Sequence, residues 1–185
     1  MASAAVHADL APSDWVLRWM CLLPPGCAVL DLACGRGRHA LVLARRGHRV
    51  LAVDRDSAAL ASMPADPGID TLQADLEGRD WPLGGRRFGG VIVTNYLYRP
   101  RFAAVLDLLE PSGLLIYETF AAGNERFGKP SNPDFLLRPG ELLERVHGRL
   151  RVVAYEEGVV AQPRPAVVQR ICARAETAIT TALAC

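Results

Sequence analysis

Four residues near the start of the chain have the types and the spacing to hold a nucleoside. Gly35 and Gly37 lie in a short loop, with Asp31 just before it and Asp54 further along. Glycine lets the backbone approach a ligand where a Cβ would collide. A helix after this loop would point its free amides and the positive end of its dipole at the same place. Asp54, at the end of the next expected strand, can accept hydrogen bonds from both ribose hydroxyls. The pattern therefore predicts a site for an adenosine-type ligand.

The charge of Asp31 separates two kinds of adenosine ligand. The loop also reads as Gly35-x-Gly37-x-x-Ala40, a permitted form of the dinucleotide-binding fingerprint. An acid at the end of the first strand would repel a pyrophosphate, but it suits the amine and sulfonium of S-adenosylmethionine. A charge so close to a buried strand is costly unless something compensates it. Two simpler interpretations remain: Asp31 only caps loop amides, and the two glycines only form a tight turn.

The elements that must position these residues are short apolar runs that alternate with helix-like segments. This alternation predicts βαβ units and a mostly parallel α/β sheet. We expect strands at 27–32, 49–54, 69–74, 91–94, 113–119, 150–156 and 166–174, and helices at 15–23, 38–46, after Asp56 or Ser57, 100–109 and 141–146. The last two strands should pair antiparallel, because the segment between them is short and contains two prolines. Residues 120–135 should form a long loop, and such loops tend to be functional.

The segment Asp31-Leu-Ala-Cys-Gly35-Arg-Gly37 resembles the first motif of the class I S-adenosylmethionine-dependent methyltransferases, acid-x-Gly-x-Gly-x-Gly. Ala33 stands where that pattern has its first glycine. The resemblance implies a Rossmann-like, seven-stranded, mostly parallel sheet with the order 3-2-1-4-5-7-6, an antiparallel last pair and helices on both faces. It covers nearly the whole chain, so we expect one methyltransferase domain over residues 1–176 and a C-terminal tail over 177–185.

The resemblance also implies the cofactor, S-adenosyl-L-methionine, which leaves as S-adenosyl-L-homocysteine. Asp31, Gly35 and Gly37 would surround its methionine part, and Asp54 would hold the ribose. Asp75 matches the family acid that binds the adenine amino group, and the Leu76 amide would lie near the ring. The expected cofactor set is completed by Ala33, Arg55 and Asn95, the last at the methyl-transfer end. Asp75 could instead cap a turn, and Asn95 could merely bridge loop backbone.

Methyl transfer from a sulfonium is an in-line displacement, so the protein has mainly to align the reacting atoms, which can contribute on the order of 7–11 kcal/mol. A base is needed only if the acceptor must lose a proton. The catalytic residue is therefore left open, with Asn95, Tyr96 and Glu118 as candidates. Glu118 could act as a base, or it could orient a neighbouring hydroxyl or arginine.

Acceptor contacts should come from the N-terminal helix, the ends of the fourth and fifth strands and the long loop, because ligands bind in that crevice. The candidates are Trp15, Tyr98, Arg99, Phe120, Asn124 and Phe127, with Trp19, Arg126 and Asn132 beside them. The tryptophans could instead dock their helix on the sheet, and the tyrosines could be partly buried at its edge. His39 is expected on a helix surface.

Bulk properties limit the partners. The formal net charge is +1, so overall electrostatics recruit neither nucleic acid nor an anionic membrane. There is no apolar run near the roughly 20 residues that cross a bilayer. The five cysteines show no CxxC or zinc-site spacing, which favours free thiols, no metal and a reduced cytosol. We expect a small-molecule methyl acceptor and a monomer or homodimer. Among class I enzymes, the chain is similar to small stand-alone bacterial types, such as the tellurite-resistance and thiopurine methyltransferases.

Three other functions stay open. An NAD(P)-dependent oxidoreductase could use the same glycine loop, but the chain has one lysine, Lys129, and no Tyr-x-x-x-Lys pair. An RNA methyltransferase would need more than the local basic character of Arg86, Arg87, Arg99 and Arg101, which have no aromatic platform beside them. The third alternative is a non-catalytic cofactor-binding subunit. The intact pair of acids, Asp31 and Asp54, argues against it.

Overall fold

A seven-stranded sheet forms the centre of the computed structural model, which describes residues 11–176. Its strand order is β3-β2-β1-β4-β5-β7-β6, as the sequence predicted. The strands are β1 (Ala28–Leu32), β2 (Arg49–Asp54), β3 (Ile69–Gln73), β4 (Phe88–Thr94), β5 (Leu109–Phe120), β6 (Leu150–Val160) and β7 (Ala166–Ala175). The first five run parallel, and β7 pairs antiparallel with both β5 and β6.

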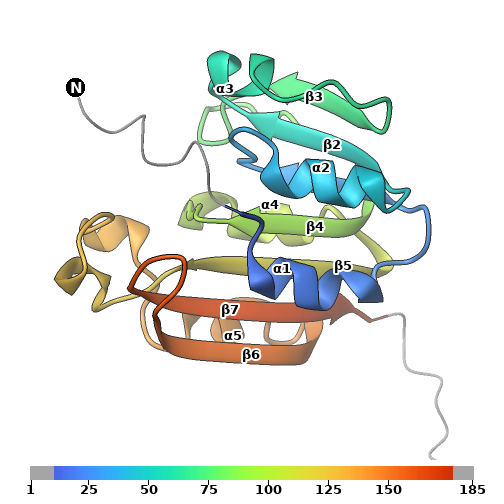
Figure 1. Ribbon diagram of the computed structural model, residues 1–185. Helices are drawn as coiled ribbons and strands as arrows, with labels where there is room; N and C mark the ends of the chain where they lie inside the picture. The colour runs from blue at the N-terminus through green and yellow to red at the C-terminus, as the bar shows by residue number, and fades with distance from the viewer. Residues whose placement is uncertain (1–10, 177–185) are drawn as a thin grey trace, which may run out of the picture.

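Helices cover both faces of the sheet (Figure 1). They are α1 (Asp14–Trp19), α2 (Arg38–Arg45), α3 (Ser57–Ala61), α4 (Phe102–Leu106) and α5 (Glu141–Val146). The view in Figure 1 places α1 and α2 in front of the sheet and α4 and α5 behind it. Two expected N-caps are present, since the Ser13 side chain accepts from the first-turn amides of α1 and the Asp56 side chain does so for α3.

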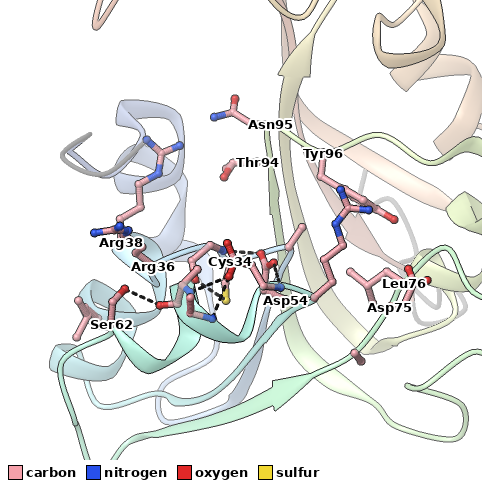
Figure 2. Close-up of a pocket in the computed structure, with 18 of the residues that line it drawn as sticks. Cys34, Arg36, Arg38, Asp54, Ser62, Asp75, Leu76, Thr94, Asn95 and Tyr96 are labelled. Atoms are coloured by element: carbon pink, nitrogen blue, oxygen red, sulfur yellow. Dashed lines mark hydrogen bonds between the residues drawn. The ribbon is translucent and has the colours of Figure 1, made fainter. Parts of the chain in front are cut away.

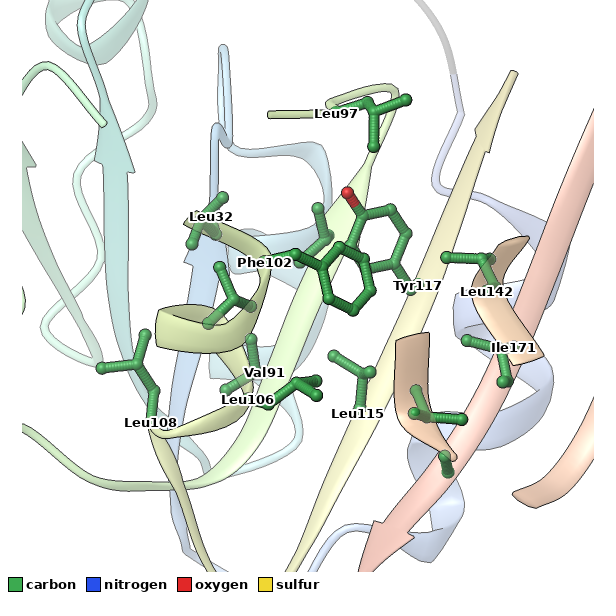
Figure 3. Close-up of a cluster of buried hydrophobic side chains, with 14 of the residues drawn as sticks. Leu32, Val91, Leu97, Phe102, Leu106, Leu108, Leu115, Tyr117, Leu142 and Ile171 are labelled. Carbon is green, nitrogen blue, oxygen red and sulfur yellow. The ribbon is translucent and has the colours of Figure 1, made fainter. Parts of the chain in front are cut away.

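The larger apolar core lies between the sheet and the layer of α4 and α5. Side chains that alternate along β4 and β5, among them Val91, Leu115 and Tyr117, point into this layer. The Phe102 ring of α4 stacks on the Tyr117 ring with 5.4 Å between their centroids (Figure 3). A second core under α1 and α2 contains the opposite face of the same strands. The ends of β4 and β5 are thus fixed from both sides.

The sequence prediction started two central strands too late. β4 begins at Phe88 rather than residue 91, and β5 begins at Leu109 rather than residue 113, so the predicted helix 100–109 was too long. Gly89 and Gly90 lie within β4, where neighbouring side chains fill the space beside them. A Cβ on Gly90 would lie 2.3 Å from the Leu23 side chain. Packing, rather than turn formation, explains these glycines.

The other boundaries differ by smaller amounts. α1 stops at Trp19 and continues as a single 3-10 turn, η1 (Met20–Leu22). β6 runs to Val160, beyond the predicted residue 156. The expected loop contains two 3-10 turns, η3 (Asn124–Arg126) and η4 (Pro133–Phe135), and a third, η2 (Arg99–Arg101), precedes α4. The predicted tail, 177–185, lies outside the described residues, and the domain division stays a prediction.

No helix within residues 11–176 is both long enough and apolar enough to span a bilayer. The four cysteines of this part of the chain, Cys21, Cys27, Cys34 and Cys172, are free thiols.

Candidate functional site

A cleft of about 990 Å³ opens at the carboxyl edge of the parallel strands, where the loops after β1, β2, β3 and β4 meet. Figure 2 shows its two sides, with Arg36 and Arg38 on the α2 side and Asp75, Leu76 and Tyr96 on the other. The cleft is lined by most of the predicted cofactor residues, namely Ala33, Gly35, Asp54, Arg55, Asp75, Leu76 and Asn95, and by Tyr96. Asp31 and Gly37 lie behind this lining rather than in it.

The glycine loop owes its shape to three left-handed residues, Ala33, Gly35 and Gly37, with φ values of 56°, 57° and 73°. The turn is closed by a hydrogen bond from the Gly37 amide to the Cys34 carbonyl. A Cβ built on Gly35 meets nothing within 4 Å, so the loop leaves open space on the cleft side. A Cβ on Gly37 would instead strike the Met63 side chain. Gly35 therefore faces the open cleft, whereas Gly37 has a packing role.

Asp54 joins the end of β2 to the glycine loop. Its Oδ2 accepts from the Gly35 amide at 2.7 Å, and its Oδ1 accepts from the Asp56 amide at 2.9 Å. Each carboxylate oxygen has a second lone pair, so both can still accept a hydroxyl from the cleft. The predicted ribose acid thus also fixes the loop that contacts the rest of the ligand.

Asp31 is almost completely buried beneath the loop, with 1% of its surface exposed. Its Oδ2 accepts from the Ala40 amide at 3.0 Å, so it caps the first turn of α2 rather than an amide of the loop. Its Oδ1 is buried and has no partner among the described residues. Burial raises the pKa of this carboxyl to about 7, although the Ala40 bond and the Arg38 charge act in the opposite direction. A cation brought near Oδ1 would offset this cost.

The other end of the cleft has an acid, an amide and an aromatic ring. Asp75 accepts from the Glu77 amide at 2.9 Å, which makes it a turn cap with lone pairs to spare. Leu76 is buried, and its own amide makes no hydrogen bond to the described residues. The Tyr96 hydroxyl is buried without a partner in this part of the chain. Burial raises the pKa of Tyr96, with Glu77 and Asp75 adding to the effect, so the phenol stays protonated and does not act as a base.

Thr94 is the last residue of β4, and Asn95 follows it. Asn95 takes a left-handed φ of 55°, which asparagine tolerates better than most residues, and its amide donates to the Glu118 carbonyl at 2.9 Å. Asn95 is one of the residues that line the cleft. Thr94 Oγ1 lies 3.5 Å from Nδ1 of His39.

The prediction for His39 was wrong, because the imidazole is buried rather than on a helix surface, with 1% of it exposed. Its Nε2 accepts from the Ser13 amide at 3.0 Å, and its Nδ1 faces Thr94. Burial lowers its pKa to about 3, and the neighbouring Arg38 adds to this effect. His39 is therefore a neutral link between α1, α2 and β4. Nothing in the local sequence of α2 indicated that a polar residue on its inner face would link these three elements.

Glu118 does not line the cleft. It forms an ion pair with Arg170 of β7 at 2.5 Å, directly across the β5–β7 ladder. Arg170 also contacts Glu156 at 3.4 Å, and Glu156 pairs with Arg18 of α1 at 3.1 Å. Of the two roles considered from the sequence, orienting an arginine is the one that this geometry supports.

The six predicted acceptor residues lie outside the lining of the cleft. Trp15 is buried, and its indole Nε1 donates to the Ile171 carbonyl, which docks α1 on the sheet. Tyr98 donates to the Glu77 carbonyl at 3.4 Å. Phe120 packs in a small cluster under the long loop, while Phe127 is exposed on it.

Arg99 and Asn124 hold the long loop in place. The Arg99 guanidinium donates to both carboxylate oxygens of Glu141 at 2.8 Å and to the carbonyls of Asp134 and Leu136. Burial alone would raise the pKa of Glu141, but hydrogen bonds from Arg99, the Arg138 amide and Arg145 lower it to about 2. Asn124 is buried and bridges Pro130 to the Val167 amide. These contacts fix the loop rather than leave side chains free for a ligand.

Comparisons with known proteins agree with this geometry. A family profile described as a methyltransferase domain matches residues 29–113. YqeM of Bacillus subtilis, whose name assigns it provisionally to the methyltransferases, is 28% identical over 136 residues, which are 64% of this chain and 54% of YqeM. The chain thus spans about half the length of that curated relative. TehB from Haemophilus influenzae superposes with a TM-score of 0.70 and 19% identity, over 94% of this chain and 64% of TehB.

A third similar protein shows a ligand in its solved structure. The Burkholderia thailandensis 1,6-didemethyltoxoflavin-N1-methyltransferase, with bound 1,6-didemethyltoxoflavin and S-adenosylhomocysteine, matches with a TM-score of 0.64 and 21% identity, over 88% of this chain and 77% of that one. The profile match over residues 29–113 includes the glycine loop and both of its flanking acids, Asp31 and Asp54. The superposed structures show that the chain shares their fold.

The residues in and behind the cleft fit S-adenosylmethionine as a cofactor. The buried and unpartnered Oδ1 of Asp31 suits the cationic methionine end, and the open space beside Gly35 gives room for it. Asp54 would hold the ribose hydroxyls, and the free Leu76 amide would donate to the adenine.

Sequence reasoning missed several lining residues of the cleft, above all Arg38 at the first position of α2. It also missed the α3 side of the cleft, which includes Ala58, Ser62 and Pro64. Arg38 directly follows the glycine motif, and this position at the start of the helix is the sequence feature that could have identified it as a lining residue. The α3 residues have no chemical signature and are placed only by the fold.

Proposed function

We propose that this protein transfers the methyl group of S-adenosylmethionine to a small-molecule acceptor. The observation that carries the proposal is the continuous cleft from Asp75 and Leu76, past the open face of Gly35, to Asn95. Its volume of about 990 Å³ is at the upper end of the roughly 300–1,000 Å³ typical of small-molecule sites. A cofactor and a small acceptor can share such a space.

The residues of the chain bind and align. When bound, S-adenosylmethionine supplies an electrophilic methyl group on a sulfonium. Asp54 and Leu76 would fix the nucleoside, and Asp31 the amine. With the nucleoside held at one end, the side chain of Asn95 faces the space where an acceptor would meet the methyl group. Alignment of this kind can supply on the order of 7–11 kcal/mol.

No general base is required of this site. Glu118 is held by Arg170, His39 is buried with its pKa at about 3, and the Tyr96 phenol stays protonated. An acceptor whose attacking atom already has a free lone pair suits such a site best, for example a thiolate or a neutral amine. The Burkholderia neighbour, named as an N1-methyltransferase of 1,6-didemethyltoxoflavin, supports a small molecule as acceptor.

Calorimetry with S-adenosylhomocysteine and with NAD tests the cofactor end. We expect S-adenosylhomocysteine to bind the wild-type chain and to raise its melting temperature, and NAD to do neither. Binding of NAD alone would replace the proposal with an oxidoreductase. Methyl uptake from labelled cofactor, screened over thiols, amines, phenols, chalcogen oxyanions and RNA, then tests the acceptor. Uptake by RNA alone would contradict a small-molecule acceptor.

A further inference from the structure

Arg38 is a cation in the cleft that has no counter-ion among residues 11–176. It lines the cleft from the first position of α2 and is partly buried. One hydrogen bond is seen from its guanidinium within residues 11–176, from Nη1 to the Ala11 carbonyl at 3.1 Å. No carboxylate of these residues lies within 4.0 Å of its guanidinium nitrogens. A partly buried charge in this condition is costly unless an anion joins it.

The nearby acids are already committed to other partners. Glu118 pairs with Arg170, and Glu156 pairs with both Arg170 and Arg18, so this row of charges across β5, β7, β6 and α1 holds two acids and two arginines. Asp31 is buried, and its Oδ2 accepts a hydrogen bond from the Ala40 amide of α2. Burial lowers the pKa of Arg38, and Glu118 and Asp31 offset only part of this. Three arginines line the cleft without an ion pair to residues 11–176, namely Arg36, Arg38 and Arg55, and of these Arg38 is the one that is partly buried.

The position of Arg38 says which end of the cleft an anion would occupy. Figure 2 shows its guanidinium at the level of Thr94 and Asn95, on the far side of the glycine loop from Asp75 and Leu76. Its hydrogen bond to Ala11 directs it toward the start of α1, and the acid that acts on it most is Glu118, at the end of β5. An anion there lies between the N-terminal helix and the ends of β4 and β5, where the proposed acceptor would enter.

We propose that Arg38 binds a carboxylate of the methyl acceptor, and hence that the acceptor is a small acidic molecule. This inference rests on the proposed function and narrows it. The planar guanidinium offers a carboxylate two parallel N–H donors, which makes such pairs short and specific. The cofactor's own amino-acid carboxylate has the same chemistry, so the test must separate the two sources.

The first arm of the test uses binding rather than turnover. The protein is saturated with S-adenosylhomocysteine and titrated with acetate, benzoate and succinate, each against its amide, at constant ionic strength with ligand-observed NMR. We expect at least one acid to bind wild type ten-fold or more tightly than its amide, and Arg38→Gln to remove that preference. Arg46→Gln is the matched control, since it removes one positive charge from the exposed, opposite end of α2. Arg38→Lys should retain part of the preference, because lysine keeps the positive charge but lacks the two parallel N–H donors of the guanidinium.

The second arm compares S-adenosylhomocysteine with 5′-deoxy-5′-methylthioadenosine, which lacks the amino-acid part. If Arg38 serves the acceptor, Arg38→Gln leaves both affinities within two-fold of wild type. A loss of ten-fold or more for S-adenosylhomocysteine alone would assign Arg38 to the cofactor and overturn the inference. It is equally overturned if no acid is preferred over its amide, or if Arg38→Gln keeps the preference. Failure of wild type to bind S-adenosylhomocysteine at all would instead remove the proposed function, and the inference with it.

Discussion

The Gly35 amide donates to Oδ2 of Asp54 across 2.7 Å, so the acid expected to hold the ribose also holds the glycine loop. Binding and local structure therefore depend on the same carboxylate. A substitution at position 54 changes both, and the two effects must be measured separately.

Asp54→Ala should weaken S-adenosylhomocysteine binding at least ten-fold and lower the free energy of unfolding by about 2 kcal/mol, because two backbone amides lose a charged acceptor. Asp54→Asn keeps one acceptor oxygen, so it should lose less of both. Calorimetry gives the affinity and urea unfolding the stability. An alanine variant that binds as well as wild type would show that Asp54 does not hold the ribose.

Ala33→Gly should stabilise the protein by about 1 kcal/mol. Ala33 has a φ of 56°, where an alanine pays roughly 1–2 kcal/mol that a glycine avoids, less the extra chain entropy that glycine loses on folding. Ala103→Gly in α4 is the control, because it is helical and exposed and should destabilise by roughly 0.5–1 kcal/mol. The measurement is chemical unfolding of both variants. If the two glycine variants changed stability equally, the left-handed conformation at position 33 would be refuted.

Asp31→Asn should stabilise the ligand-free protein and weaken its cofactor site. The pKa of Asp31 is raised from an ordinary 3.8 to about 7 by burial, so the folded state favours the protonated acid. The stability that this acid contributes is fully present below about pH 4 and is lost as the pH rises through about 7. The gain from Asp31→Asn should therefore be larger at pH 8 than at pH 5.

Cofactor affinity should depend on the ionisation of Asp31 in the opposite direction to stability. The ammonium of S-adenosylhomocysteine favours ionised Asp31, so wild-type affinity should rise with pH through about 7, and Asp31→Asn should flatten that rise. Calorimetry at pH 5.5, 7 and 8.5 makes the comparison. A pH profile that is the same in both proteins would exclude contact between Asp31 and the amine.

His39 should make the protein sensitive to acid. Its pKa is lowered from 6.5 to about 3 by burial and by Arg38, so the folded state favours the neutral ring. The stability from this group is present above about pH 6.5 and is lost as the pH falls toward 3. His39→Gln should reduce the slope of stability between pH 6 and pH 4. The test is urea unfolding across this range, and an unchanged slope would mean that another group controls acid unfolding.

Arg99→Gln should loosen the long loop without changing cofactor affinity. The substitution removes the bonds to Glu141 and to the carbonyls of Asp134 and Leu136, and leaves Glu141 with fewer partners. We expect a loss of about 3 kcal/mol in stability and faster hydrogen exchange in residues 132–137. S-adenosylhomocysteine should still bind within two-fold of wild type. Unchanged exchange in this segment would contradict the role of Arg99 as its anchor.

The family resemblance implied the sheet order that the structure shows, and local patterns indicated the centre of the expected cofactor site. Strand, glycine loop, helix and acid succeed one another along the chain, so Gly35 and Asp54 were accessible from spacing alone. The acceptor end was predicted less well, since its side chains come together only through long-range packing. Arg99 was predicted to contact the acceptor, but it pairs with Glu141. Glu141 lies far from it in the sequence, so no local pattern indicates this pair. His39 was misplaced for the same reason.

The imidazole of His39 has a consequence for how sequence change would spread through this site. Because one ring nitrogen accepts from the amide before α1 and the other faces the hydroxyl that ends β4, three elements are fastened at a single side chain. The positions of α1, α2 and β4 relative to one another thus depend on the same side chain. A replacement at position 39 that cannot accept from the Ser13 amide and reach the Thr94 hydroxyl would therefore release α1 and β4 from α2 at the same time.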